Sequence, residues 1–495
     1  MRGRCWTKLS RMDRDDTALD EWEVLDLLTS LVDKSLVVYE EDEQGVGRYR
    51  LLETVRQYAH ERLLIDDNSA IVRGRHLDYF LGWAEGAGSQ LVGPEQKWWC
   101  DRLETEHDNL RAALDWCLSD SAAGDTSLRA TYALAFYWWV RSHATEGYSY
   151  LRAALAQDMA ARPTAARART LCAAAVLAHV FGDLDAVHAL QDEALAIAQV
   201  VGDEESIASS YNRLGAAAFH ECDFDTACVF LERAMRMDLS LDRYAEASGS
   251  MAVLAGVAIR RGDFAAAKDR ADEALRLARM GGQTHNEAFA EILRGHAALY
   301  LQDYGAAQAG FEQALKLVLA SGAQVWESWA LEGLGRVALL LDDMSSARAH
   351  LERGVNVCRA GHQPGMEGRC LLALAYVAYH EHDYNQAGSR TREAIKLLQP
   401  TRMKWEIVCA LEATAAVMVQ LERLTSAARL YSAATAQRSR MGSPVALAPW
   451  TDGADNMALA QQALGGAGFS AAWQAGQHMT LEQAVEYALS ESEAA

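Results

Sequence analysis

The five residues Gly182-Asp183-Leu184-Asp185-Ala186 form a short pattern that returns every forty residues along the chain. In most copies an aspartate is followed by an aromatic or aliphatic residue. The later copies are Cys222-Asp223-Phe224, Gly262-Asp263-Phe264, Gln302-Asp303-Tyr304, Asp342-Asp343-Met344, His382-Asp383-Tyr384 and, in degraded form, Glu422-Arg423-Leu424. A fixed period of this length predicts a solenoid, in which each unit buries its apolar face against its neighbours.

Small residues keep the same register on both sides of this pattern. The three series run from Ala175 to Ala415, from Val187 to Ala427 and from Ala194 to Ala434. Small side chains let antiparallel helices approach closely, and the Gly-Asp step fits a helix end followed by an N-cap. This spacing resembles the tetratricopeptide repeat, although its usual period is about 34 residues and HEAT-type repeats, at about 40–47, come nearer. We expect a mainly α fold, a right-handed superhelical solenoid of about seven 40-residue tetratricopeptide-like helix pairs.

The N-terminal part of the chain has a different pattern. An apolar helix over 22–32 is followed by a β-like run over 35–39, a Gly-containing turn, a second β-like run over 48–52 and another helix from Glu53. The stretches 25–37 and 49–59 closely resemble the winged-helix segment of bacterial STAND-type regulatory ATPases, which occur in LuxR-type and antibiotic-regulatory transcription factors. We therefore expect a small α+β winged-helix remnant in front of the solenoid.

The resemblance extends over most of the chain. Residues 75–80 and 103–116 are similar to the helical block that joins winged helix and repeats in that family, and 469–485 is similar to its closing helices. The resemblance implies five parts: a disordered leader (1–20), a partial winged-helix segment (21–66), a helical linker block (67–124), the repeat array (125–440) and capping helices (441–495). No GxxxxGK[ST] motif occurs in the sequence. We thus expect a sensor half that lacks both the P-loop ATPase module and the output DNA-binding domain.

Composition narrows the possible partners. The formal net charge is −21, which argues against a general nucleic-acid-binding surface. The acidic run 40–43 next to Arg48 and Arg50 would repel phosphate, so direct DNA contact is not expected. No apolar run reaches the ~18–20 residues that span a bilayer, and no signal peptide is visible. Nine cysteines without a CxxC pair suit reduced thiols, so we expect a cytoplasmic protein.

The sequence offers little catalytic chemistry. His380 and His382 are two residues apart and face different sides of a helix end, and no HExxH or GxSxG motif is present. We expect neither enzymatic activity nor a cofactor or metal site.

The better candidate is the concave groove, which the first helix of each pair should line. The residues we expect there mix aromatic, arginine and histidine side chains, which suit a peptide or small effector. They are Asn212, His220, Arg260, His296, Tyr300, Glu332, Arg336, Tyr376, Tyr379 and His380. This pattern predicts a non-enzymatic sensor that binds an effector or partner protein, with a homo-oligomer or a partner ATPase as further possibilities. The alternatives are a DNA-binding regulator acting through the winged helix and the remnant of an ATP-dependent switch.

Overall fold

The computed structural model describes residues 21–41, 47–88, 90–93, 95–119, 124–157, 161–444 and 453–493. The leader expected at 1–20 lies outside these ranges. Twenty-three α-helices and one two-stranded sheet make up the described part, so the predicted mainly α class is confirmed.

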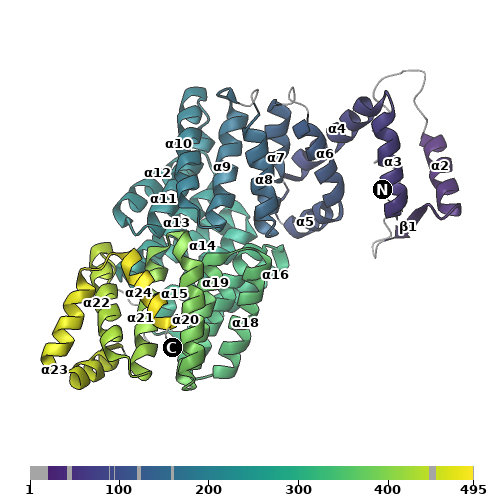
Figure 1. The fold of residues 1–495 in the computed structure, drawn as a ribbon. Coiled ribbons are helices and arrows are strands. Elements are labelled where there is room, and N and C mark those ends of the chain that lie inside the picture. The colour runs from purple at the N-terminus through teal and green to yellow at the C-terminus, as the bar shows by residue number, and fades with distance from the viewer. Residues whose placement is uncertain are drawn as a thin grey trace.

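The N-terminal unit has the predicted order of helix, strand, strand and helix. It consists of α2 (Glu21–Asp33), β1 (Val37–Glu41), β2 (Gly47–Leu51) and α3 (Glu53–Ile65). The strands are antiparallel, with Val37 opposite Leu51 and Tyr39 opposite Tyr49. This unit lies at one end of the molecule (Figure 1), and a long helix, α4 (Ser69–Gly88), leads from it to the rest of the chain.

Two shorter helices, α5 (Gln96–Thr105) and α6 (His107–Ser119), complete the linker and pack beside the repeat array. Eight helix pairs follow in the described residues, seven of them in the forty-residue register and one ahead of it. They are α7 (Gly124–Val140) with α8 (Ala144–Leu155), α9 (Ala165–Val180) with α10 (Leu184–Val201), α11 (Glu204–His220) with α12 (Phe224–Ser240), α13 (Tyr244–Arg261) with α14 (Phe264–Gly281), α15 (Thr284–Tyr300) with α16 (Tyr304–Ser321), α17 (Glu327–Leu340) with α18 (Met344–Ala360), α19 (Pro364–His380) with α20 (Tyr384–Leu398), and α21 (Lys404–Gln420) with α22 (Leu424–Met441).

The repeating aspartate caps the second helix in six consecutive pairs, as predicted. Its side chain accepts a hydrogen bond from the backbone N–H three residues on, over 3.0–3.2 Å. The residue at the position before it has a left-handed φ in all seven copies, between 60° at Glu422 and 80° at Gly262, which ends the first helix. In the degraded last copy Arg423 makes no side-chain cap. The left-handed residue is kept where the aspartate is lost, so the forty-residue period is seen in the backbone turn as well as in the side-chain cap.

The small residues allow the two helices of a pair to touch. A Cβ added at Gly215 would lie 2.7 Å from Leu231, and one added at Gly335 would lie 2.5 Å from Leu351. The leucine of the second helix occupies the space that the glycine leaves open, and both leucines are fully buried. This close fit agrees with the spacing rule that predicted the repeat.

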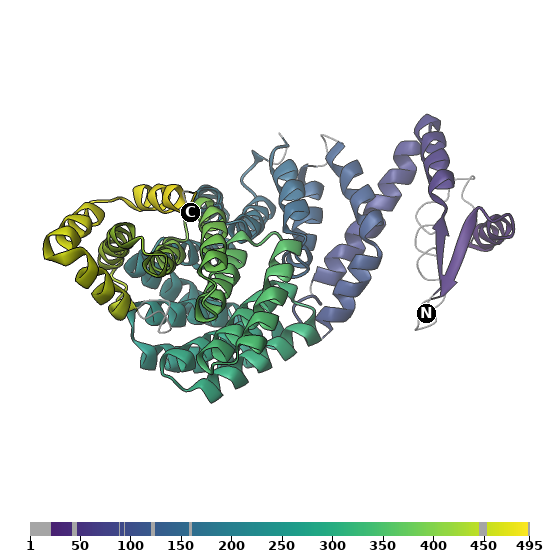
Figure 2. The ribbon, with the colours of Figure 1, turned by 60° about the horizontal axis from the view of Figure 1, so that its bottom comes forward.

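The superhelix closes on itself. In Figure 1 the helices from α7 to α12 form an upper tier and those from α15 to α24 a lower one, and Figure 2 shows the array curling round. Trp139 meets Trp326 with ring centroids 5.8 Å apart, and Arg402 pairs with Asp185 at 2.7 Å. The Ser443 hydroxyl donates to the Arg260 carbonyl oxygen over 2.8 Å. Residues more than 140 positions apart thus meet across the centre.

Two helices close the C-terminal end. These are α23 (Gly453–Gln477), which bends at Gly465, and α24 (Leu481–Glu493), which packs on α20, α21 and α22. Among the described helices, none is both long and apolar enough to cross a membrane.

Candidate ligand-binding site

The curled superhelix holds a partly open chamber of about 220 Å³ at its centre. Its wall comes mainly from the first helices of successive pairs, α7 through α21, because these helices face the superhelix axis. The volume is below the usual ~300–1,000 Å³ of small-molecule pockets. The chamber lies on the concave side where we expected a groove, and Trp326, Trp405 and their neighbours narrow it from the opposite tier.

Aromatic rings form much of the apolar wall. They are Trp139, Phe219, Phe289, Tyr300, Trp326, Trp329 and Trp405. Phe289 stacks on Trp326 with centroids 4.3 Å apart and planes at 14°. These rings come from five different first helices or from the turns beside them, so the chamber exists only when the whole array is assembled.

A buried chain of ion pairs crosses the polar side of the cavity. Glu406 accepts from Arg260 at 2.7 Å and from Arg369 at 3.4 Å. Arg369 also reaches Glu332 at 3.2 Å, and Arg336 lies 3.6 Å from the same carboxylate. Burial alone would raise the pKa of Glu406, but Arg260 and Arg369 outweigh it and hold the pKa below its usual value. Glu406 is therefore ionised and holds Arg260 and Arg369 in place.

Arg260 also stacks on Trp405. Its guanidinium carbon lies 3.3 Å from the centroid of that indole ring and 5.4 Å from the centroid of Phe219. Arg260 is on α13 and Trp405 is on α21, so this contact joins the two tiers. Its geometry combines a cation–π contact with an ion pair, which a lysine could not reproduce.

One lining arginine differs from the others. The side chain of Arg213 on α11 is half-buried and makes no hydrogen bond or ion pair with any described residue, and desolvation lowers its pKa. Several buried lining nitrogens also lack partners in the part of the chain that the structure describes: Arg260 Nη1, Arg369 Nε, Trp326 Nε1, Trp405 Nε1, His179 Nδ1, His220 Nδ1 and His296 Nε2.

The cavity histidines are neutral. Burial lowers the pKa of His220 to about 4, and it also holds the pKa of His179 and His296 well below the ordinary value. The rings of His179 and His220 meet edge to face at 4.9 Å. They extend the aromatic wall without adding charge near neutral pH.

The structure separates the ten predicted groove residues into two groups. His220, Arg260, His296, Tyr300 and Arg336 line the cavity. Glu332 stands behind the wall as a counter-ion, and buried Asn212 donates to the Ser250 hydroxyl over 2.8 Å.

The three predicted residues of the last-but-one pair are not on the cavity wall. Tyr376 lies in the apolar core with α21 and α22, and the hydroxyl of Tyr379 contacts Asn456 of α23. His380 is exposed at the end of α19. The first half of α19, including Arg369, lines the cavity, whereas these three residues lie in its second half, where Tyr376 and Tyr379 pack toward α21, α22 and α23.

Sequence reasoning missed Arg213, Arg369, Trp139, Trp326 and Trp405. The first two lie on first helices at offsets that our register did not include, two residues before and six residues before the small residue. The tryptophans lie near helix ends, where the two tiers meet. A wider set of inward positions would have found the arginines, but no local signal marks the tier contact.

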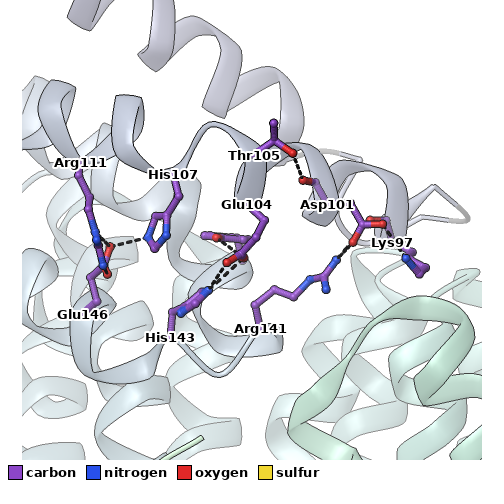
Figure 3. Close-up of polar contacts among 10 residues, drawn as sticks. Lys97, Asp101, Glu104, Thr105, His107, Arg111, Arg141, His143 and Glu146 are labelled. Atoms are coloured by element: carbon purple, nitrogen blue, oxygen red, sulfur yellow. Dashed lines mark hydrogen bonds and ion pairs between the residues drawn. The ribbon is translucent and has the colours of Figure 1, made fainter. Parts of the chain in front are cut away.

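A second polar cluster joins the linker to the first helix pair (Figure 3). The Tyr137 hydroxyl donates to Glu104 over 2.7 Å, and His143 lies 3.0 Å from the same carboxylate. His107 lies 2.7 Å from Glu146, which also accepts from Arg111. Glu104, His107 and His143 lie close enough together to share a metal ion. Each of them already has a hydrogen-bond partner, so the cluster is accounted for as a hydrogen-bonded joint.

The joint continues toward both ends of the molecule. On the array side, Arg141, in the turn after α7, pairs with Asp101 of α5, and Trp139 near the end of α7 lines the cavity. On the other side, Glu106 pairs with Arg48 of β2 at 3.3 Å. One continuous set of contacts thus runs from the cavity wall to the winged-helix unit.

Comparison with known proteins gives the N-terminal unit its class. A family profile described as a winged helix-turn-helix domain matches residues 12–64. The HTH-type transcriptional regulators Rv0890c of Mycobacterium tuberculosis and Mb0914c of Mycobacterium bovis are each 38% identical to this chain over 213 residues. The match covers 41% of this chain and 24% of each relative, so it spans about a quarter of the length of these curated relatives.

Solved structures give the fold of the array. A Rap protein complexed with competence and sporulation factor superposes with a TM-score of 0.55 at 15% identity, over 73% of this chain and 98% of that chain. A STAND protein with a tetratricopeptide repeat sensor from Pyrococcus horikoshii superposes with a TM-score of 0.42 at 16% identity, over 84% and 59%. The chain therefore joins a winged helix-turn-helix segment to tetratricopeptide-like repeats and is distantly homologous to proteins named as transcriptional regulators.

Proposed function

We propose that this chain is the non-enzymatic sensor part of a transcriptional regulator of the STAND type, and that a small effector binds in the central cavity. One observation carries the proposal: the cavity is built by both tiers of the superhelix, so its occupant would contact residues far apart in the chain. Filling such a space ties the two tiers together and favours the closed form, by as much as the effector prefers that form.

The linker joint supplies a route for the signal. Trp139, on the cavity wall, is at the end of α7, and Arg141, on the linker face, is in the turn directly after it. A shift of α7 against α15 and α17 would move Arg141 and Tyr137 against α5. The Glu106–Arg48 pair then connects the linker to the winged-helix unit. The Rap protein was solved in complex with competence and sporulation factor, which supports the use of such an array as a binding module.

The test is a thermal-unfolding screen of the full chain with fractionated small molecules from the native cell. A ligand that binds only the folded chain raises its unfolding temperature. The control variants are at Gly249, which lines the cavity and at which an added Cβ would meet nothing within 4 Å. Gly249→Phe fills the space, whereas Gly249→Ser changes the same position and leaves it open.

We expect at least one fraction to stabilise the wild type and Gly249→Ser but not Gly249→Phe, with mass spectrometry naming the bound compound. If no fraction stabilises the wild type, or if every active fraction stabilises Gly249→Phe equally, the cavity is not the effector site.

The second candidate is direct DNA binding, which the winged helix-turn-helix match favours. Against it, three arginines of this unit already have carboxylate partners: Arg48 with Glu106, Arg50 with Glu40, and Arg56 with Glu53. Fluorescence anisotropy with duplex DNA decides between the two. Binding that weakens steeply with salt, and weakens further in Arg48→Ala, would support this alternative.

A further inference from the structure

We propose that the effector is a small aromatic organic acid, whose carboxylate is held at Arg213 and whose ring lies among the cavity tryptophans. This inference rests on the proposed function, because it names the class of compound that the cavity takes.

The ion pairs of the cavity wall leave one arginine aside. Arg213, Arg260, Arg336 and Arg369 line the cavity, and the carboxylates Glu332 and Glu406 pair with the last three of them. Arg213 is half-buried and has no counter-ion among the described residues. Removing part of a charge from water without a counter-ion is costly, and an anion in the cavity would reduce that cost.

Arg213 lies outside the ion-pair network of the cavity wall. Arg260 and Arg369 share Glu406, and Arg369 and Arg336 share Glu332, so three arginines belong to one network with two carboxylates. Arg213 belongs to no such network among the described residues, yet it lines the same cavity. A planar guanidinium without a partner is suited to bind a carboxylate or phosphate through two parallel hydrogen bonds.

The cavity wall also carries hydrogen-bond donors that have no acceptor. The unpartnered lining atoms include four that can only donate: Arg260 Nη1, Arg369 Nε, Trp326 Nε1 and Trp405 Nε1. Arg260, Arg369 and Trp405 are at most 7% exposed. Buried donors without acceptors are rare in folded proteins, so this wall calls for a ligand rich in oxygen acceptors.

The aromatic rings of the cavity indicate the apolar part of the ligand. Phe289 and Trp326 are stacked on one side of the chamber, and Trp139 and Trp329 each meet Trp326 edge to face. A flat aromatic body can extend these stacking contacts. The volume of about 220 Å³ restricts the ligand to a small compound and leaves no room for a folded partner.

The experiment is isothermal titration of the full-length chain with three matched probes: 1-naphthoate, 1-naphthamide and 1-naphthyl phosphate. The amide keeps the ring and removes the charge, and the phosphate tests the other common oxyanion. Arg213→Gln removes the proposed anchor without breaking an ion pair. Arg276→Gln is the matched control, because Arg276 pairs with Glu273 on an exposed face of α14.

We expect naphthoate to bind the wild type at least tenfold more tightly than naphthamide. In Arg213→Gln this preference should disappear, while Arg276→Gln keeps it. Gly249→Phe should bind none of the probes. If 1-naphthyl phosphate binds more tightly than 1-naphthoate, the oxyanion site at Arg213 is retained, but the effector is a phosphate ester and the carboxylic acid is ruled out.

Equal binding of naphthoate and naphthamide, lost in Gly249→Phe, would overturn the anion inference while leaving the cavity as an effector site. Binding of all probes by Gly249→Phe as well would contradict the cavity itself. A response only to peptides in the extract screen, with no probe bound, would replace the small acid by a peptide.

Discussion

At the scale of single residues, the repeat depends on its capping aspartates. Each one satisfies a backbone N–H that would otherwise be unpaired in the first turn of the second helix. The residue type, its spacing from the small residues and the left-handed residue before it all point to the same local structure. This agreement is why the turn could be predicted residue by residue.

Asp263→Ala tests the cap. The variant loses the hydrogen bond to the Ala266 N–H, so we expect the free energy of unfolding to fall by about 1 kcal/mol. Asp263→Asn keeps an accepting oxygen and should remain close to the wild type in urea unfolding. An equal loss in both variants would show that charge, and not the cap, is what matters at this position.

Asp238 should make stability depend on pH. Burial raises its pKa to about 7, although Arg243 at 3.1 Å partly opposes this shift. Because the folded pKa is above the unfolded value, the folded chain holds its proton longer. Stability is then lost as the pH rises from about 4 to 7.

Asp238→Asn cannot ionise, so the difference in unfolding free energy between this variant and the wild type should grow in the variant's favour by roughly 1 kcal/mol per pH unit across that window. Urea titrations at pH 5, 6, 7 and 8 measure it. A constant difference at all four pH values would mean that Arg243 fully compensates the carboxylate.

At the scale of the elements, the contribution of the contact between the tiers to stability can be measured separately from that of the left-handed turns. Gly182 and Gly202 both have φ near 75°, at 75° and 72°. A Cβ at Gly182 would lie 2.6 Å from the Cβ of Thr401 in the opposite tier, whereas one at Gly202 would meet nothing within 4 Å. The two positions share the backbone strain and differ in the contact.

We expect Gly202→Ala to cost about 1 kcal/mol, the price of a left-handed alanine. Gly182→Ala should cost a further 1 to 3 kcal/mol, because the methyl group forces the tiers apart. Thermal unfolding of the two variants gives the comparison. Equal costs would mean that the tiers separate without loss of stability.

At the scale of the whole molecule, the buried histidines should make the chain sensitive to acid. Burial lowers the pKa of His285 to about 3 and that of His220 to about 4. In the unfolded chain both would take up a proton near pH 6.5. The stability they contribute is complete above pH 6.5 and is lost as the pH falls toward their folded values.

His285 lies edge to face against Phe136 and Trp139, so His285→Phe keeps an aromatic ring there and removes the titration. We expect the loss of unfolding free energy between pH 7 and pH 5.5 to shrink by about 1 kcal/mol in this variant. His382→Asn, at an exposed turn, should leave the loss unchanged. A wild-type slope in His285→Phe would place the titration elsewhere.

The limits of sequence prediction follow the same scales. The caps, the glycine–leucine contacts and the winged-helix hairpin each depend on residues within about twenty positions, and all were predictable. The cavity between the tiers depends on Arg260 meeting Trp405 and Glu406 after four repeats of accumulated curvature. Small changes in the packing angle of each pair add up over that distance, and no residue pattern records the sum. Half of the expected groove residues therefore line the cavity, while Tyr376, Tyr379 and His380 belong to the end that the closing helices cover.

The Arg402–Asp185 and Ser443–Arg260 contacts also bear on how such a gene can change. An open array gains or loses a unit at little cost, because each unit meets only its neighbours. Here the duplication of a single repeat would carry Arg402, Trp405 and Ser443 past their partners and leave charged and aromatic groups facing the wrong positions. We therefore expect relatives with this closure to keep the number of repeats between the two tiers and to vary in repeat number at the ends of the array.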